Sequence, residues 1–408
     1  MLWERKLERY ISEWRSRGSI PLRLQLWNGQ QMSLCDQNQS NYVVLKVQRP
    51  SALKVLWNPS LGTLGGAYVE GDIDIEGRLP DVMQAAWSWV KTANAGKSKR
   101  PLRFVRHSRR LDKKAIEYHY DVGNDFYRLW LDEQMVYSCA YFEYGDETLE
   151  QAQIKKVDHI LRKLKLQPGE HLLDVGCGWG ALAIRAAQHY GAQVYGITLS
   201  QQQYEFATQR IKNLGLQERI RIEIRDYRDL LPEFQSRFEK ISSVGMFEHV
   251  GLKNMALYFS TLKQLLKPGG LVLNHGITST DASDGETPYA GGDFIHRYVF
   301  PHGELLHIGT VLKEMQKGGL EVCDVESLRR HYARTLSIWS HRFEAQAAEA
   351  HRLAGERRFR IWRLYLAACA QAFETDWISL FQILACHTGG GSANPLPWSR
   401  RYQYEASQ

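Results

Sequence analysis

Residues 172–180, with the sequence LLDVGCGWG, have the composition and spacing that most clearly suggest chemistry. An apolar run reaches Asp174, and Gly176, Gly178 and Gly180 then form a tight turn that opens into a helix. Glycine adopts φ > 0 and has no Cβ, so the backbone of such a turn can lie against a ligand. The turn therefore predicts a site for a nucleotide-sized cofactor, although an ordinary strand-to-helix turn also fits the pattern.

The acidic residue in this turn restricts the charge of the cofactor. A dinucleotide-binding fingerprint reads GxGxxG and directs a helix N-terminus at a pyrophosphate. Here Asp174 stands one residue before a GxGxG. A carboxylate would repel a phosphate but can receive a cationic or ammonium-bearing ligand.

Helical and strand-like patterns alternate from residue 149 onward, and these elements must position the turn. Helices are expected at 150–166, 181–189, 201–214, 252–267, 303–317, 336–353 and 356–374. Strands are expected at 171–175, 192–197, 219–224, 239–244, 270–275, 320–325 and 378–386. This alternation predicts an α/β fold with a doubly wound, mostly parallel, Rossmann-like sheet. Ligands bind beyond the carboxyl ends of such strands, where Thr198, Asp226, Glu248 and His275 should converge.

The first part of the chain has a different pattern and predicts a small α+β domain over residues 1–95. Its expected elements are a helix at 2–17, a hairpin across Asn28-Gly29 that joins strands 22–27 and 32–34, strands at 42–47 and 67–75, and a helix at 79–90. We divide the rest into a basic linker at 96–112, a catalytic domain at 113–388 and a flexible tail at 389–408. Residues 97–110 hold seven Lys or Arg and no acid, which suits either a solvated connector or a patch that binds an anionic surface.

The overall composition is that of a globular chain, with 44% apolar and 24% charged residues. Neither a secretory leader nor a run of about 18 uncharged apolar residues is visible, so we expect a cytoplasmic location. The formal charge of +7 suits an anionic partner, either nucleic acid or an acidic membrane. The six cysteines lack the paired spacing of metal ligands, so no metal is expected.

Several motifs together resemble the cyclopropane fatty acid synthase family, which also includes the mycolic acid cyclopropane synthases. They are EYHYDVGNDFY (117–127), YSCAYF (137–142), LLDVGCGWG (172–180), ITLSQQQ (197–203), DYRDL (226–230), SVGMFEHVG (243–251), HYARTLSIWSHRF (331–343) and YLAACAQAF (365–373). The resemblance implies an S-adenosylmethionine-dependent enzyme that adds a methylene across the cis double bond of phospholipid acyl chains. It also implies a sterol-carrier-like, lipid-binding N-terminal domain, a homodimer, and peripheral association with the anionic inner face of the membrane, without nucleic acid.

The resemblance assigns site residues by their positions in these motifs. Together with the turn, the cofactor contacts that we predict are Tyr137, Ser138, Asp174, Gly176, Gly178, Gly180, Thr198, Ser200, Gln203, Tyr227 and Arg228. A bound bicarbonate is implied as the base, held by the side chains of Cys139, Glu248, His275 and Tyr332 and by the backbone of Ile277. Cys369 matches the cysteine traditionally marked as the active-site residue of the family. Its apolar helical surroundings instead favour a role in lining the pocket, because burial raises the pKa of a thiol.

The implied reaction sets requirements on the site. An alkene attacks the methyl group of a sulfonium, and the resulting carbocation loses a proton as the ring closes. The site must then provide a base, aromatic faces that stabilise the cation, and exclusion of water. The base is either bicarbonate or Glu248 itself.

Two other readings of the function stay open. One is a related enzyme that makes methyl-branched acyl chains or methylates a small-molecule amine. The other is a lipid-binding protein with a vestigial cofactor site. The combination of Cys139, Glu248, His275 and Tyr332 favours the cyclopropane synthase, because neither an amine nucleophile nor a simple binder needs a polar anion pocket.

Overall fold

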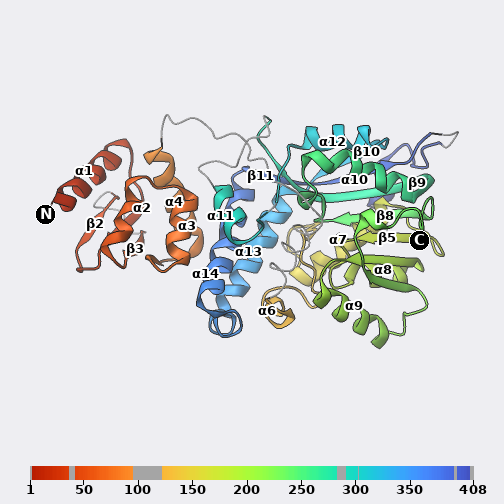
Figure 1. The fold of residues 1–408 in the computed structure, drawn as a ribbon, viewed down its shortest axis with the longest axis horizontal. Helices are drawn as coiled ribbons and strands as arrows, with labels where there is room; N and C mark the ends of the chain where they lie inside the picture. Colours follow the sequence, from red (N-terminus) through yellow and green to blue (C-terminus); the bar gives the residue numbers. More distant parts are fainter. Residues whose placement is uncertain are drawn as a thin grey trace.

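The computed structural model describes residues 2–35, 42–94, 122–282, 291–301, 303–389 and 393–404. Its larger sheet consists of β5 (His171–Val175), β6 (Gln193–Thr198), β7 (Ile220–Ile224), β8 (Phe238–Val244), β9 (Leu266–Ser279), β10 (Glu321–Ser327) and β11 (Ile378–Cys386). These seven strands are ordered β10-β11-β9-β8-β5-β6-β7 (Figure 1). β11 runs antiparallel to the two strands that it pairs with, β10 and β9, and the other pairs are parallel, which confirms the predicted mostly parallel α/β sheet.

Helices cover both faces of this sheet. They are α7 (Leu149–Lys163), α8 (Ala181–Tyr190), α9 (Gln201–Asn213), α10 (Leu252–Leu265) and α12 (Ile308–Lys317). Leu172 belongs to the hydrophobic cluster of α7, α8 and α9, whereas Leu173 belongs to that of α10 and α12. Successive side chains of a strand point to opposite faces, so this apolar run needs a helix layer on each side.

The strands of the sheet lie close to their predicted positions, and β5 and β11 coincide with them. β9 is longer than the predicted strand 270–275, because it pairs with β11 from Leu271 to Ser279. The short helices of this region are α6 (Asn124–Arg128), α11 (Gly291–Tyr298), η2 (Tyr227–Asp229) and η3 (Phe247–His249). The region ends with the long helices α13 (Arg329–Ala345) and α14 (Ala347–Glu374), the latter kinked at Gly355, where φ is +74°.

The described residues between 2 and 94 form what we call the N-terminal unit. Its elements are α1 (Leu2–Arg17), β1 (Leu22–Gln25), β2 (Gln31–Ser33), β3 (Val43–Val47), η1 (Pro50–Ala52), α2 (Leu53–Trp57), α3 (Leu61–Val69), β4 (Ile73–Glu76) and α4 (Leu79–Ala93). The strands form one sheet in the order β2-β1-β3-β4, with β1 and β2 paired across the predicted hairpin.

One predicted element of the N-terminal unit is wrong. Residues 67–75 were expected to form a strand, but Ala67–Val69 end the helix α3 and only Ile73–Glu76 form a strand. A capping box between Ser60 and Thr63 begins this helix. That local signal, together with the packing of the helix, outweighs the β propensity of the tyrosine and valine at its end.

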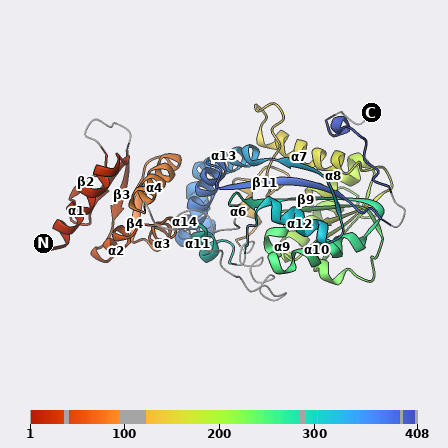
Figure 2. The same ribbon diagram turned by 90° about the horizontal axis from the view of Figure 1, so that it is seen from above.

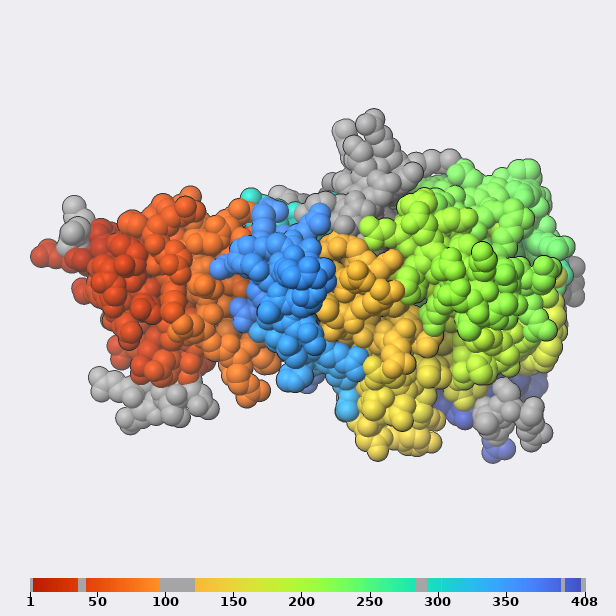
Figure 3. Space-filling model, turned by 90° about the horizontal axis from the view of Figure 1, so that it is seen from below, coloured from red at the N-terminus to blue at the C-terminus, as the bar shows by residue number. Residues whose placement is uncertain are grey.

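The N-terminal unit packs against α11 and α14, which lie between it and the larger sheet (Figure 2). α3 contacts both helices, and α4 contacts α14. Ala367 of α14 belongs to the hydrophobic core of the N-terminal unit. In the space-filling view the same arrangement is visible from outside, with the blue of α14 against the orange of the N-terminal unit (Figure 3). The boundaries of the predicted domains stay predictions, and the linker at 96–112 lies outside the described residues.

The prediction of a flexible tail is wrong for residues 393–404. This segment contains η5 (Arg400–Gln403), and Gln403 is only 2% exposed. The side-chain amide of Gln403 donates to Asp324 Oδ2 at 2.8 Å, and Tyr402 donates to the carbonyl of Lys163. The tail therefore lies against β10 and α7. Among the described helices, none is long and apolar enough to cross a bilayer.

Candidate active site

The glycine turn lies where the strand order reverses. β5 pairs with β6 on one side and with β8 on the other, and the turn follows the carboxyl end of β5. This is the position at which doubly wound sheets bind ligands. The N–H groups of Gly176 and Cys177 donate to the carbonyl of Ile197 at 3.0 and 2.9 Å, which fixes the turn against β6.

A cavity of about 160 Å³ opens at this turn, and we call it the glycine-turn cavity. The predicted cofactor residues that line it are Tyr137, Ser138, Asp174, Gly176, Gly178, Thr198, Gln203, Tyr227 and Arg228. Gly178 has a φ of +55°, and a Cβ at this position would meet no atom within 4 Å. The space beside Gly178 is therefore open to a ligand.

Two predicted cofactor residues do not line the cavity. Gly180 is the N-cap residue of α8 with φ of +85°, and a Cβ there would lie 3.2 Å from that of Ala207. Its role is close helix packing. Ser200 is the N-cap residue of α9, where its hydroxyl accepts from the N–H of Gln203 at 3.3 Å.

One wall of the glycine-turn cavity carries polar and aromatic side chains from the ends of β6 and β7. The Thr198 hydroxyl donates to Gln203 Oε1 at 2.9 Å, so these two residues form one polar unit. Asp226 accepts from the guanidinium of Arg228 at 2.8 and 2.6 Å. Tyr227 is 5% exposed and packs edge-on against Tyr258, with ring centroids 5.0 Å apart, so its ring is held in a fixed orientation.

The opposite wall holds two buried groups of opposite charge. Asp174 is 2% exposed; its Oδ1 accepts from the Ser242 hydroxyl at 2.7 Å, and its Oδ2 has no partner among the described residues. Burial raises the pKa of Asp174 to about 6, against the lowering effects of Ser242 and Lys156. Lys156 is also 2% exposed, donates to the Ser138 hydroxyl at 2.8 Å, and has no ion pair with any described residue. Burial lowers the pKa of Lys156 to about 8.

This pair suits a zwitterion. An α-ammonium group fits the free oxygen of Asp174, and an α-carboxylate fits Lys156, since each buried charge needs an opposite partner. Lys156 is not among the site residues predicted from the sequence. The signal available was that Lys156, His159 and Lys163 are polar residues on the buried face of one helix.

A second, larger cavity of about 310 Å³ lies beside the first, and we call it the apolar cavity. Near the sheet it is lined by all the residues predicted to hold an anion, namely Cys139, Glu248, His275, Ile277 and Tyr332, and by Cys369. Tyr137, Ser138, Gly245 and His249 line both cavities. The two cavities therefore meet at these four residues.

Glu248 is the acidic group of this cluster. It is 7% exposed, and its Oε1 accepts from the backbone N–H of Ile277 at 2.7 Å. The backbone N–H of Ile277, expected to hold an anion, is thus bonded to Glu248 in this structure. Oε2 has no partner among the described residues, and burial raises the pKa of Glu248 to about 7. Gly276 permits this arrangement, because a Cβ there would lie 2.0 Å from a ring carbon of Phe247 and 3.0 Å from Glu248 Oε1.

His275 is a neutral hydrogen-bond donor. Burial lowers its pKa well below the usual value. The Gln382 amide nitrogen lies 3.3 Å from His275 Nδ1, so Nδ1 accepts and the single ring proton lies on Nε2. Nε2 has no partner in the described part of the chain. It is therefore available to donate to a group in the cavity.

The remaining groups of the cluster are also uncharged. Burial raises the pKa of the Tyr332 hydroxyl well above its usual value, and Tyr365, Cys139, Cys369 and Glu248 add to the effect. Burial likewise raises the thiol pKa of Cys139, and raises that of Cys369 to about 12. Cys369 is thus a thiol in the cavity wall. In the described residues, no group of three or more His, Cys, Asp or Glu could hold a metal.

The fold, the glycine turn and the zwitterion-binding pair define an S-adenosylmethionine-dependent methyltransferase. A family model described as mycolic acid cyclopropane synthetase matches residues 107–383, and the chain belongs to this family. A model for a domain of unknown function matches residues 11–96.

Individual relatives agree with this assignment. A probable fatty acid methyltransferase from Pseudomonas putida is 47% identical over 385 residues, which are 94% of this chain and 96% of the relative. Cyclopropane mycolic acid synthase 1 of Mycobacterium tuberculosis is 38% identical over 278 residues, 65% of this chain and 94% of the relative. The crystal structure of mycolic acid cyclopropane synthase CmaA1 complexed with SAH and CTAB has a TM-score of 0.63 and 36% identity, over 67% of this chain and 98% of that one.

The role of Lys156 can be tested with two ligands. Lys156→Met should weaken S-adenosylhomocysteine binding roughly tenfold to a hundredfold, since a hydrogen bond to a charged group contributes about 1.5–3 kcal/mol. Binding of 5′-methylthioadenosine, which lacks the amino-acid group, should not change. Titration calorimetry with both ligands measures this. Lys155→Met is the matched control, because Lys155 pairs with Glu143 and does not line the cavity. Equal losses for the two ligands would contradict the assignment.

Proposed function

We propose that this protein transfers a one-carbon unit from S-adenosylmethionine to the cis double bond of an unsaturated phospholipid acyl chain and forms a cyclopropane. The observation that carries the proposal is the meeting of the two cavities at Tyr137, Ser138, Gly245 and His249. One cavity suits a zwitterionic nucleoside, and the other suits a hydrocarbon chain. A methyl donor and an alkene held in these cavities would face each other at the junction.

The residues of the chain that would hold the methyl donor are those of the glycine-turn cavity, with Asp174 and Lys156 at its amino-acid end. S-adenosylmethionine supplies an electrophilic methyl group on a sulfonium. The chain's own contribution is orientation and exclusion of water. Tyr137 lies at the junction, and its hydroxyl lies 3.2 Å from that of Tyr365. The faces of such aromatic rings stabilise positive charge that develops on the substrate.

The proton that leaves the substrate needs a base. Glu248 and His275 each present a buried polar atom without a partner among the described residues, and Tyr332 adds a neutral donor. The thiol of Cys139 lines the same cavity but donates to the carbonyl of Ala140 at 3.2 Å. With Glu248 protonated, the side chains of Glu248, His275 and Tyr332 can each donate a hydrogen bond into the cavity. No Lys or Arg is among the described residues that line the apolar cavity. This donor set fits a bicarbonate ion, which would supply the base when bound there.

The substrate source and the assembly state belong to the same proposal. We infer an anionic membrane surface from the formal charge of +7 and the basic segment 97–110, which lies outside the described residues. Peripheral membrane association and a homodimer stay predictions.

A methyl-branched product is the second candidate, since a relative that matches 94% of this chain is named a probable fatty acid methyltransferase. Both reactions use the same two cavities. Methylation of an amine fits less well, because an amine needs no base deep in an apolar cavity. A vestigial binder fits less well too, because buried polar atoms without a partner destabilise a protein that does not use them.

Mass spectrometry of lipids decides between these products. Cells that express the protein should contain acyl chains that have gained one CH₂ and lost alkene reactivity, because the methyl group adds and one proton leaves. A gain of one CH₂ with the alkene retained would favour the branched product. Unchanged acyl chains would contradict both.

A further inference from the structure

The apolar cavity does not end at the catalytic residues. From Glu248 and Tyr332 it passes α14 and α11 and continues into the interior of the N-terminal unit. There it is lined by residues of α3, α4, β1, β3 and β4, among them Leu64, Met83, Leu22, Val43, Leu45 and Ile75. Leu22, Val43 and Leu45 are 3%, 4% and 6% exposed, so this far wall belongs to the core of the unit.

The N-terminal part of the cavity extends well away from the catalytic residues. β1 and β3 lie on the far side of α3 and α4 from α14 (Figures 1 and 2). A ligand that reaches Leu45 therefore passes between helices of the N-terminal unit. At the entrance, Gly65 packs so closely on α11 that a Cβ there would lie 2.6 Å from a ring carbon of Phe294.

The chemistry of this wall excludes a polar occupant. None of the described residues that line the N-terminal part carries a charge, and the polar side-chain atoms among them belong to Tyr68, Trp87 and Trp89. A charged lipid headgroup placed there would lose its hydration and would find no side chain of opposite charge in this wall, which is strongly unfavourable. A hydrocarbon chain has no polar groups that need partners, so it is the occupant that this apolar wall accommodates.

We propose that the N-terminal unit holds the methyl-terminal segment of the acyl chain whose double bond lies at the catalytic residues. This inference rests on the proposed function. It makes the N-terminal unit part of the substrate site, so the space between the catalytic residues and the far wall limits the number of carbons beyond the double bond.

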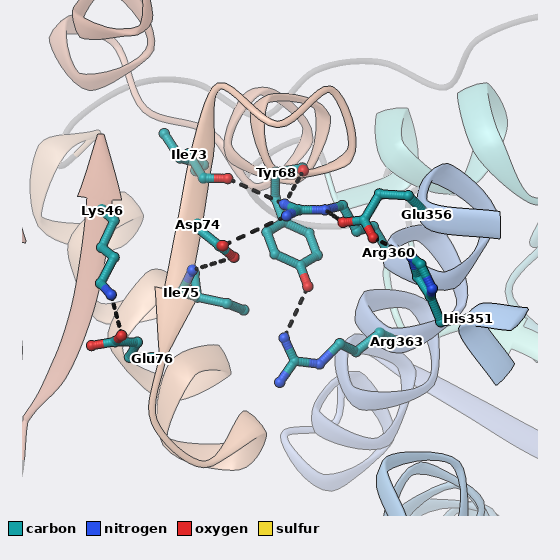
Figure 4. Close-up of polar contacts among 10 residues, drawn as sticks. All are labelled: Lys46, Tyr68, Ile73, Asp74, Ile75, Glu76, His351, Glu356, Arg360 and Arg363. Atoms are coloured by element: carbon teal, nitrogen blue, oxygen red, sulfur yellow. Dashed lines mark hydrogen bonds and ion pairs between the residues drawn. The ribbon is translucent and has the colours of Figure 1, made fainter. Parts of the chain in front are cut away.

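Polar contacts between α14 and the N-terminal unit fix the position of one part of the apolar cavity relative to the other (Figure 4). Arg360 of α14 donates to the carbonyls of Tyr68 and Ile73 at 3.0 and 3.5 Å and lies 3.5 Å from Asp74. Arg363 donates to the Tyr68 hydroxyl at 2.9 Å and pairs with both oxygens of Glu344. The guanidinium groups of Arg360 and Arg363 are partly buried, and their planar sets of N–H donors fix the orientation of the groups that they bind. The N-terminal unit is thus held at a defined position on the helix that carries Cys369.

The proposal is tested with two positional isomers of one length. Vesicles of phosphatidylglycerol contain equal amounts of octadecenoyl chains with the cis double bond at carbon nine or at carbon eleven. The carbon-nine isomer has two more carbons on its methyl side. Leu45→Phe, which shortens the cavity, should lower the ratio of carbon-nine to carbon-eleven product by about tenfold or more, because apolar pockets discriminate a single methylene by at least roughly that factor.

Leu45→Ala, which lengthens the cavity, should raise the same ratio. The ratio is internal to one reaction, so it does not depend on how much enzyme is folded. Val47→Ala is the matched control, because Val47 is a 2% exposed core residue of the same strand that does not line the cavity. Its ratio should equal that of the wild type.

The outcomes separate the inference from the proposed function. Opposite shifts in the two Leu45 variants support the inference. An unchanged ratio in both would overturn it while leaving the proposed function intact, and a shift of Leu45→Phe toward the carbon-nine product would show that the carboxyl side enters the unit. Absence of any modified chain with the wild-type protein would overturn the proposed function, and the inference with it.

Discussion

Replacing Gly178 with aspartate should abolish binding of S-adenosylmethionine while the chain still folds. A Cβ at this position meets no protein atom within 4 Å, so the new side chain would enter the space that the ligand needs. Displacing the ligand from contact with the turn should lower its affinity more than about a hundredfold, which corresponds to roughly 3 kcal/mol. The backbone cost is smaller, because a left-handed conformation costs a non-glycine residue about 1–2 kcal/mol and aspartate tolerates it.

Gly169→Asp is the matched control for this substitution. Gly169 also has a left-handed φ, +82°, and open surroundings, but it lines neither cavity. Calorimetry with S-adenosylhomocysteine and a thermal unfolding curve should be recorded for both variants. We expect similar small losses of stability and a loss of binding in Gly178→Asp alone. A folded Gly178→Asp variant with normal affinity would show that the ligand does not lie against the turn.

The position of the cofactor site was predictable because its signals are local. The turn at Gly176 and Gly178 follows directly from residue types and spacing, and the fold places it at the end of β5. Ser200 shows the limit of this reasoning. The same residue type serves for ligand contact and for helix capping, and only the three-dimensional structure shows that its hydroxyl caps α9.

Tertiary packing determines the features that residue types and spacing alone do not predict. In the sequence, Lys156 resembles a solvent-exposed lysine. It lies in the wall of the glycine-turn cavity because α7 packs there. The helix at residues 61–69 depends partly on Gly65, which permits contact with Phe294 more than 200 positions later in the chain. The apolar cavity is continuous from the catalytic residues to the N-terminal unit for the same reason, tertiary packing, because it requires α3 to contact α11 and α14.

Glu248→Gln should lower the turnover number by about 10²–10⁴-fold, the usual contribution of a general base, and His275→Ala should act in the same direction. Neither residue lines the glycine-turn cavity, so affinity for S-adenosylhomocysteine should stay near that of the wild type. Single-turnover rates and calorimetry measure the two effects separately. A large loss of cofactor affinity in either variant would place its role in the fold or in cofactor binding instead.

Two accounts of the base make different predictions for bicarbonate. If Glu248 and His275 hold the anion, carbonate-free buffer should depress the wild-type rate and added bicarbonate should restore it. A variant with a weakened anion site, such as His275→Ala, should then need more bicarbonate. If Glu248 is itself the base, removal of carbonate should have no effect, while Glu248→Gln should still be inactive.

The pH dependence adds an independent criterion, because burial raises the pKa of Glu248 to about 7. Below that pH its carboxyl is neutral and can donate to an anion; above it, the carboxylate repels one. In the bicarbonate account the rate at saturating bicarbonate should therefore fall as the pH rises through about 7, or somewhat higher, since a bound anion raises the pKa of Glu248 further. With Glu248 as the base, the rate should instead rise through the same range, because only the ionised carboxylate accepts the proton. A rate that rises with pH and is normal in carbonate-free buffer would rule out the anion mechanism.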